Sequence, residues 1–129
     1  MINLKIICFF EDVDLSMNLV PICNNTNYDL IFPDYSNFNQ DLNNIAMGVV
    51  IIDMEEEKYK MVDLIGSIYK NTYFPIIGYK NKINKKIKNE ATDIGYDIVI
   101  DKETLKRNLS VICKQIKKKL KINLMFNLK

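Results

Sequence analysis

The 129-residue sequence contains no histidine and only three cysteines, at Cys8, Cys23 and Cys113. Because the cysteines are odd in number and far apart, they do not form the paired spacings of a zinc site. The lack of histidine likewise disfavours a nucleophilic triad that uses imidazole as its base. Cys8 and Cys113 lie in apolar stretches, which predicts buried, reduced thiols and a cytoplasmic protein.

Long apolar runs are also absent. No segment approaches the roughly 20 apolar residues of a membrane-spanning helix. The first residues, MINLK, do not show the basic segment and apolar core of a signal peptide. The pattern G-x-G-x-x-G is missing, which argues against a Rossmann dinucleotide site. We therefore expect no membrane partner and no dinucleotide cofactor.

The charges are unevenly distributed along a chain whose length and composition fit one globular domain, 1–129, with 48% hydrophobic and 26% charged residues. Residues 1–74 carry a net charge of −7, and residues 75–129 carry +9. Such a split can mark a nucleic-acid-binding patch. We expect a solvated helix face instead, because aromatic residues that could stack on bases are scarce there. The lysines concerned are Lys114, Lys117, Lys118, Lys119 and Lys121.

The most informative stretch is Val49 to Ile52, four β-branched apolar residues that run directly into Asp53. A continuous apolar run of this kind is typical of a strand buried on both faces of a parallel sheet. Asp53 then falls at the carboxyl end of the strand, where ligands and chemistry collect in open α/β sheets. A turn residue or a helix cap is the alternative interpretation of Asp53, and this stretch does not decide between them.

The rest of the chain alternates between predicted strands and helices. Strands are predicted at 5–10, 28–32, 49–53, 75–79 and 97–101. The first helix, with Asp14 or Ser16 as its cap, should be short or kinked because of Pro21. The second helix is expected to begin at Ser36 or Asn37 and to end at Gly48, and the third to cover 56–69 with Val62 on its apolar side. The fourth helix is expected over 83–94, with Gly95 ending it. The last is expected over 105–120 and is followed by a looser tail at 121–129.

Five strands in alternation with five helices define the predicted fold. Short connections and right-handed crossovers favour an α/β fold in three layers. It would consist of a five-stranded, doubly wound parallel sheet of flavodoxin-like topology, with helices on both faces.

Charged residues at three strand ends would converge in such a sheet. Glu11 and Asp12 follow the first strand, Asp53 ends the third, and Lys102 follows the fifth. Grouped carboxylates are the oxygen ligands that Mg²⁺ prefers, and a lysine beside them could hold a phosphoryl oxygen. Such a group would allow an aspartate to attack a phosphoryl donor.

In element order, length and strand-end residues, the whole chain resembles the response-regulator receiver family. The resemblance implies that Asp53 is the phosphoacceptor and that Lys102 is the family's lysine after the fifth strand. It further implies that Mg²⁺ binds Glu11 or Asp12, Asp53 and the backbone carbonyl of Glu55. The sequence does not decide whether Glu11 or Asp12 faces the metal.

The sequence departs from the family at positions that report phosphorylation. The family's Ser or Thr after the fourth strand is Lys80 here, and its aromatic switch residue is Val99. The proline expected after the lysine is Glu103, and the Met-Pro expected after the phosphoacceptor is Glu56-Glu57. We expect the ammonium of Lys80 to contact the acidic cluster and neutralise it, the alternative being a side chain that points into water.

The resemblance implies a stand-alone receiver-like domain of a two-component phosphorelay, binding a histidine kinase or a downstream target. Its binding face would be the fourth helix, fifth strand and fifth helix, and its only reaction would be self-phosphorylation of Asp53. The replaced residues favour a phosphorylation-independent pseudo-receiver over a working phosphoacceptor. A flavodoxin-like ligand binder or electron carrier is the alternative class, although Glu11, Asp12 and Asp14 would repel a phosphate there. The sequence does not decide whether the chain forms a homodimer.

Overall fold

The computed structural model describes residues 3–60 and 63–125, which form alternating strands and helices as the sequence predicts. The strands are β1 (Lys5–Phe9), β2 (Asp29–Ile31), β3 (Gly48–Asp53), β4 (Ile76–Lys80) and β5 (Ile98–Asp101). The helices are α1 (Val13–Thr26), α2 (Phe38–Asn43), a short 3₁₀ helix η1 (Glu57–Tyr59), α3 (Leu64–Asn71), α4 (Lys85–Ile94) and α5 (Lys102–Met125).

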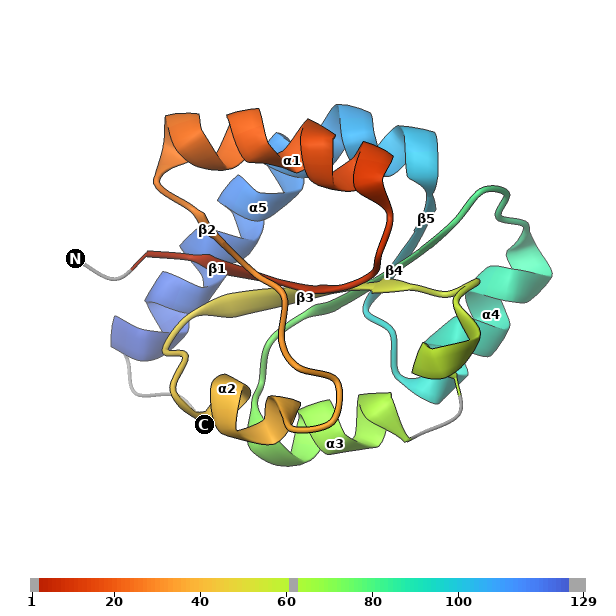
Figure 1. The fold of residues 1–129 in the computed structure, drawn as a ribbon, viewed down its shortest axis with the longest axis horizontal. Coiled ribbons are helices and arrows are strands. Elements are labelled where there is room, and N and C mark those ends of the chain that lie inside the picture. The colour runs from red at the N-terminus through yellow and green to blue at the C-terminus, as the bar shows by residue number, and fades with distance from the viewer. Residues whose placement is uncertain (1–2, 61–62, 126–129) are drawn as a thin grey trace.

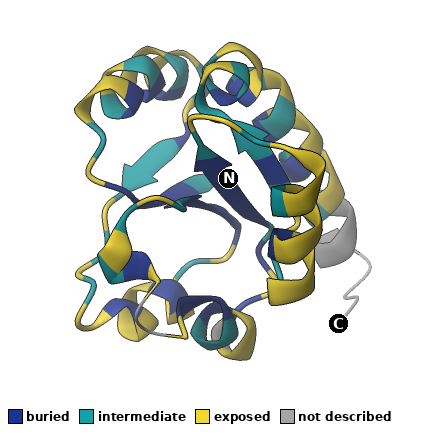
Figure 2. Ribbon diagram, turned by 90° about the vertical axis from the view of Figure 1, so that its right-hand side faces the viewer, coloured by how far each residue is buried: buried dark blue, intermediate teal, exposed yellow. Residues whose placement is uncertain are grey.

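All strand pairs are parallel, and the strand order is β2-β1-β3-β4-β5. Helices α1 and α5 cover one face of the sheet, and α2, α3 and α4 cover the other (Figure 1). The central strands are buried between the helices, whose outer faces are exposed (Figure 2). The predicted three-layer, doubly wound parallel sheet is confirmed. None of the helices in the described residues is long and apolar enough to cross a membrane.

The core has two parts, one on each face of the sheet. β3 shows why, because its side chains alternate between the two faces. Val49 and Ile51 belong to the cluster under α1 and α5, whereas Val50 and Ile52 belong to the cluster under α2 and α3. All four are fully buried, which explains why the sequence reads as a continuous apolar run.

Helix α1 is not short, because it runs through Pro21 for fourteen residues, and the kink expected as the alternative stays a prediction. A mid-helix proline costs about 3 kcal/mol. Burial of Leu15 and Leu19, worth about 1.5–3 kcal/mol each, outweighs that cost. The N-cap is Asp12 rather than Asp14 or Ser16, and its carboxylate accepts a hydrogen bond from the Leu15 amide at 3.1 Å.

The predicted helix over 56–69 is wrong, because the chain forms η1 and then a separate helix α3. Asp63 begins α3 as its N-cap and accepts a hydrogen bond from the amide of Gly66 at 2.9 Å. This cap sets the start of α3 at Leu64, five residues after Tyr59, which ends η1. Val62, expected on the apolar side of that helix, lies outside the described residues.

Other helix boundaries also differ from the prediction. Gly48 begins β3 and does not end α2, which stops at Asn43. Asn84 caps α4 through a hydrogen bond from the Ile87 amide at 2.8 Å, so the helix starts after Ile83. Helix α5 continues to Met125 and takes in most of the expected tail, of which 126–129 lie outside the described residues.

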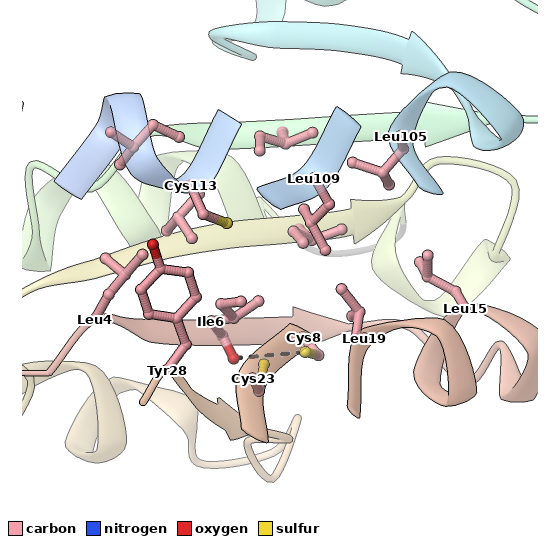
Figure 3. Close-up of a cluster of buried hydrophobic side chains, with 14 of the residues drawn as sticks. Leu4, Ile6, Cys8, Leu15, Leu19, Cys23, Tyr28, Leu105, Leu109 and Cys113 are labelled. Atoms are coloured by element: carbon pink, nitrogen blue, oxygen red, sulfur yellow. Dashed lines mark hydrogen bonds between the residues drawn. The ribbon is translucent and has the colours of Figure 1, made fainter. Parts of the chain in front are cut away.

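Cys8 and Cys113 are free, buried thiols, as predicted, and Cys23 is free and buried as well. They lie in the cluster between α1, α5 and the sheet, beside Leu19 and Tyr28 (Figure 3). Burial raises the pKa of the Cys23 thiol to about 11 and that of Cys113 to about 12. These values make the thiols poor nucleophiles at neutral pH.

Candidate functional site

The carboxyl ends of the strands bring most of the predicted site residues to one edge of the sheet. Strand register places Asp53 beside Tyr79 of β4, and Lys80 opposite Asp101 of β5. Asp12 follows β1, and Lys102 begins α5 directly after β5. The edge therefore combines carboxylates, lysines and one phenol on neighbouring elements.

Asp12 and Lys102 form the central ion pair of this edge. The Nζ atom of Lys102 lies 2.8 Å from Oδ2 of Asp12 and donates a hydrogen bond to Oδ1 at 3.1 Å. Their side chains are only 17% and 18% exposed, respectively, so the pair is largely shielded from water. Burial alone would raise the pKa of Asp12, but the hydrogen bonds from Lys102 and the Leu15 amide lower it overall. The same hydrogen bond raises the pKa of Lys102.

Further ion pairs connect the Asp12–Lys102 pair with the first turn of α1 and with the next turn of α5. Lys102 lies 3.2 Å from Oδ2 of Asp14, and Lys106 lies 3.0 Å from the same atom. Two carboxylates and two ammonium groups thus alternate across the junction of α1 and α5. This arrangement neutralises the acidic residues from within the chain.

Tyr79 is a member of the site that the sequence analysis missed. Its hydroxyl donates a hydrogen bond to Oδ2 of Asp12 at 3.3 Å. Burial raises the pKa of Tyr79 far above its usual range, and the charges of Asp53 and Asp12 add to the shift. The phenol therefore stays protonated and acts as a donor within reach of both carboxylates. Strand alternation could have suggested it, because Tyr79 follows the inward-facing Ile77 by two residues.

Asp53 lies at the end of β3 and is partly exposed. Its Oδ1 atom accepts a hydrogen bond from the amide of Glu55 at 3.0 Å, which closes a turn after the strand. The carboxylate of Glu55 in turn accepts a hydrogen bond from the Asn81 amide at 3.1 Å. Glu55 therefore links the loop after β3 to the loop after β4.

Glu11 and Lys80 do not join the Asp12 group. The carboxylate of Glu11 forms an ion pair with Lys58 of η1. Lys80 forms no ion pair with any residue in 3–60 or 63–125, so the expected contact with the acidic cluster is not seen. Alternation along β4 explains this, because Tyr79 and Lys80 point to opposite faces. Val99 lies buried on β5.

These side chains do not fit a Mg²⁺ ion as they are arranged. The described residues contain no group of three His, Cys, Asp or Glu side chains close enough to hold a metal. The oxygens of Asp12 are taken by Lys102, Tyr79 and the Leu15 amide, and Glu11 is taken by Lys58. Mg²⁺ requires near-octahedral oxygen ligands, so these contacts would have to break before it could bind.

The sequence matches no protein family and no curated protein. Solved structures, however, share its fold. A putative pilus assembly-related protein from Burkholderia pseudomallei aligns with a TM-score of 0.65 at 11% identity, over 89% of each chain. A putative pilus assembly protein from Burkholderia thailandensis aligns with 0.61 at 15% identity, over 92% of this chain and 99% of that one.

A CheY-like response regulator from Mesorhizobium loti aligns with a TM-score of 0.60 at 12% identity, over 85% of this chain and 97% of that one. Identities this low establish the fold and leave the function of the site to be argued from its residues. Together with the strand order β2-β1-β3-β4-β5, these alignments give the chain the fold of response-regulator receiver domains.

Proposed function

We propose that this chain is a receiver-like signalling adaptor that binds other proteins without phosphorylation of Asp53. The observation that supports the proposal is the engagement of Asp12 by Lys102 and Tyr79. A site that already carries its own cation and its own hydroxyl donor holds one arrangement without an external ligand. On this proposal the chain turns over no substrate.

The replaced switch positions support the same proposal. Lys80 has no hydroxyl with which to sense a phosphoryl group, and Val99 has no ring that could change position. Glu55 already links the loops after β3 and β4 through Asn81. The loop that would respond to phosphate is therefore held by a contact that phosphate does not supply.

A working phosphoacceptor is the second candidate, because Asp53 is partly exposed and its charge is not paired with a lysine among the described residues. In that case Mg²⁺ and a phosphodonor would displace Lys102 or Tyr79 from Asp12. A histidine kinase would then be the partner. A flavodoxin-like ligand site gains no support, since Asp12 and Asp14 lie in the loop and first turn after β1, where a phosphate would bind.

The test is exposure of the purified protein to Mg²⁺ with acetyl phosphate, and separately with beryllofluoride. Intact mass spectrometry measures phosphorylation, and amide NMR spectra follow Asp53, Lys80 and Lys102. We expect no phosphoryl adduct and no Mg²⁺-dependent shifts in the wild-type protein. An adduct that Asp53→Asn abolishes, and that the exposed α4 control Asp93→Asn retains, would overturn the proposal in favour of the phosphoacceptor.

A further inference from the structure

The outer face of α1 is unusual for a helix at the surface, because it carries no charge. Asp14 is the one charged residue among the fourteen of α1, and it is directed at Lys102 and Lys106. Val13, Met17 and Val20 are 69%, 70% and 46% exposed. At this spacing they form one apolar stripe on the side opposite the buried Leu15 and Leu19.

A row of lysines runs beside this stripe on α5. Helices α1 and α5 lie side by side on the same face of the sheet (Figure 1), and the Lys106–Asp14 ion pair marks the side of α5 that faces α1. Lys117 lies about three turns further along that side, whereas Lys114 lies about two turns along and roughly 80° round the helix from Lys106, where it is exposed. The Nζ atom of Lys117 lies 5.4 Å from the ring centroid of Tyr28, just after α1.

These lysines have no negative partner within the described part of the chain. Lys114 is exposed, and neither it nor Lys117 forms an ion pair there. The surface is therefore apolar along α1 and positively charged along α5. The complementary surface would carry apolar side chains beside carboxylates.

We propose that the outer face of α1 and the adjoining lysines of α5 bind an acidic amphipathic helix of a partner protein. The inference rests on the adaptor function proposed above and names the partner's chemistry. Val13 and Val20 are seven residues apart, which corresponds to roughly 10 Å along α1, and Met17 lies between them. A partner helix presents three apolar side chains at i, i+3 or i+4, and i+7 over the same length.

An anionic membrane is the competing occupant, and the stripe itself argues against it. Helices that lie in a lipid surface carry large apolar side chains such as Trp, Phe and Leu. The outer face of α1 offers valine and methionine flanked by Asn24 and Asn25, which suits a polar protein rim. Methionine also adapts its shape to a helical partner.

The test uses a phage-displayed library of single helices, randomised at their solvent positions and selected on the folded wild-type protein. We expect enrichment of helices with an apolar stripe flanked by Asp or Glu. A synthetic peptide of the enriched sequence should lose about tenfold or more in affinity with Met17→Asp or Lys114→Glu. The matched α4 variants, Ile94→Asp and Lys88→Glu, should leave its affinity unchanged.

Each outcome decides the proposal. No enrichment, enrichment without acidic residues, or amide shifts of the bound protein outside α1 and α5 would overturn it. Binding to vesicles of phosphatidylglycerol and phosphatidylcholine that Met17→Asp abolishes, without peptide binding, would replace it with a membrane surface. Phosphorylation of Asp53 beside intact peptide binding would refute only the proposed function. If the wild-type protein formed no phosphoryl adduct and also bound no such peptide, only this inference would be refuted.

Discussion

The ammonium of Lys102 lies 2.8 Å from Oδ2 of Asp12, and both side chains are more than four-fifths shielded from water. Lys102 follows β5 and Asp12 follows β1, so the pair connects two elements at the same edge of the sheet. Asp12 also caps α1, and its cap hydrogen bond strengthens when the carboxylate is ionised. Asp12 therefore both stabilises α1 as its cap and binds Lys102 in the site.

Lys102→Met should destabilise the protein by about 1–2 kcal/mol, because it leaves the shielded Asp12 carboxylate without its cation. Urea unfolding measures the change. Asp12→Asn should cost a similar amount through the weakened cap, and the double variant should cost less than the sum of the two. Strictly additive effects would show that the two groups do not interact.

The Asp12 pair also predicts how stability depends on pH. The pKa of Asp12 is lower in the folded chain than in the unfolded chain, so the folded state favours the ionised form. The resulting stabilisation is complete above the unfolded pKa of about 3.9 and is lost as the pH falls through the folded pKa. Urea unfolding in steps below pH 5 should therefore show a steeper acid loss for wild type than for Asp12→Asn. Parallel curves would contradict the assignment.

Tyr79→Phe removes the hydroxyl that reaches Asp12 and keeps the ring that packs on Phe10, with centroids 6.0 Å apart. We expect a loss of stability of about 0.5–1.5 kcal/mol, the net value of one hydrogen bond. The phenol should not ionise before alkaline unfolding, because burial and the two carboxylates raise its pKa. An alkaline absorbance titration of the folded state should thus be the same for wild type and Tyr79→Phe.

Gly95, which ends α4, adopts a positive φ of 130°. A Cβ atom there would lie 2.8 Å from side-chain carbons of both Ile65 and Tyr69. Gly95→Ala should therefore lower stability by about 1 kcal/mol or more, through backbone strain and this contact. Asn27→Gly is the matched control, since Asn27 adopts a φ of 60° that glycine tolerates, and it should be close to neutral.

The fold could be predicted because its strands are encoded locally. A continuous apolar run such as Val49 to Ile52 is typical of a strand buried on both faces of a parallel sheet, and five predicted strands with helices between them permit few topologies. Helix boundaries were less predictable, because several residues could serve as caps. Asp12 and Asp14 are equally good caps by residue type, and the structure selects Asp12, whose carboxylate accepts the hydrogen bond from the Leu15 amide.

The sequence could predict which residues lie at the candidate site, but not which of them form ion pairs or hydrogen bonds with one another. Strand ends place Asp12, Asp53 and Lys102 at one edge, as the sequence indicates. The ion pairs depend on how far side chains extend from one element to another, which the sequence does not give. Lys58 and Glu11, for example, pair although they are 47 residues apart in the sequence. Tyr79 was missed because its role depends on the face of β4 to which it points.

The three thiols provide a probe of the cluster between α1, α5 and the sheet. Cys8, Cys23 and Cys113 are buried, and burial raises the pKa of each, so a thiol reagent should not modify the folded protein at neutral pH. Cys23 lies near the end of α1 and is 6% exposed, whereas Cys113 is fully buried. Under mild denaturant, mass spectrometry should detect labelling of Cys23 before Cys113, because helix ends open locally at lower free energy than the core. Simultaneous labelling would instead show that this half of the core opens only in global unfolding.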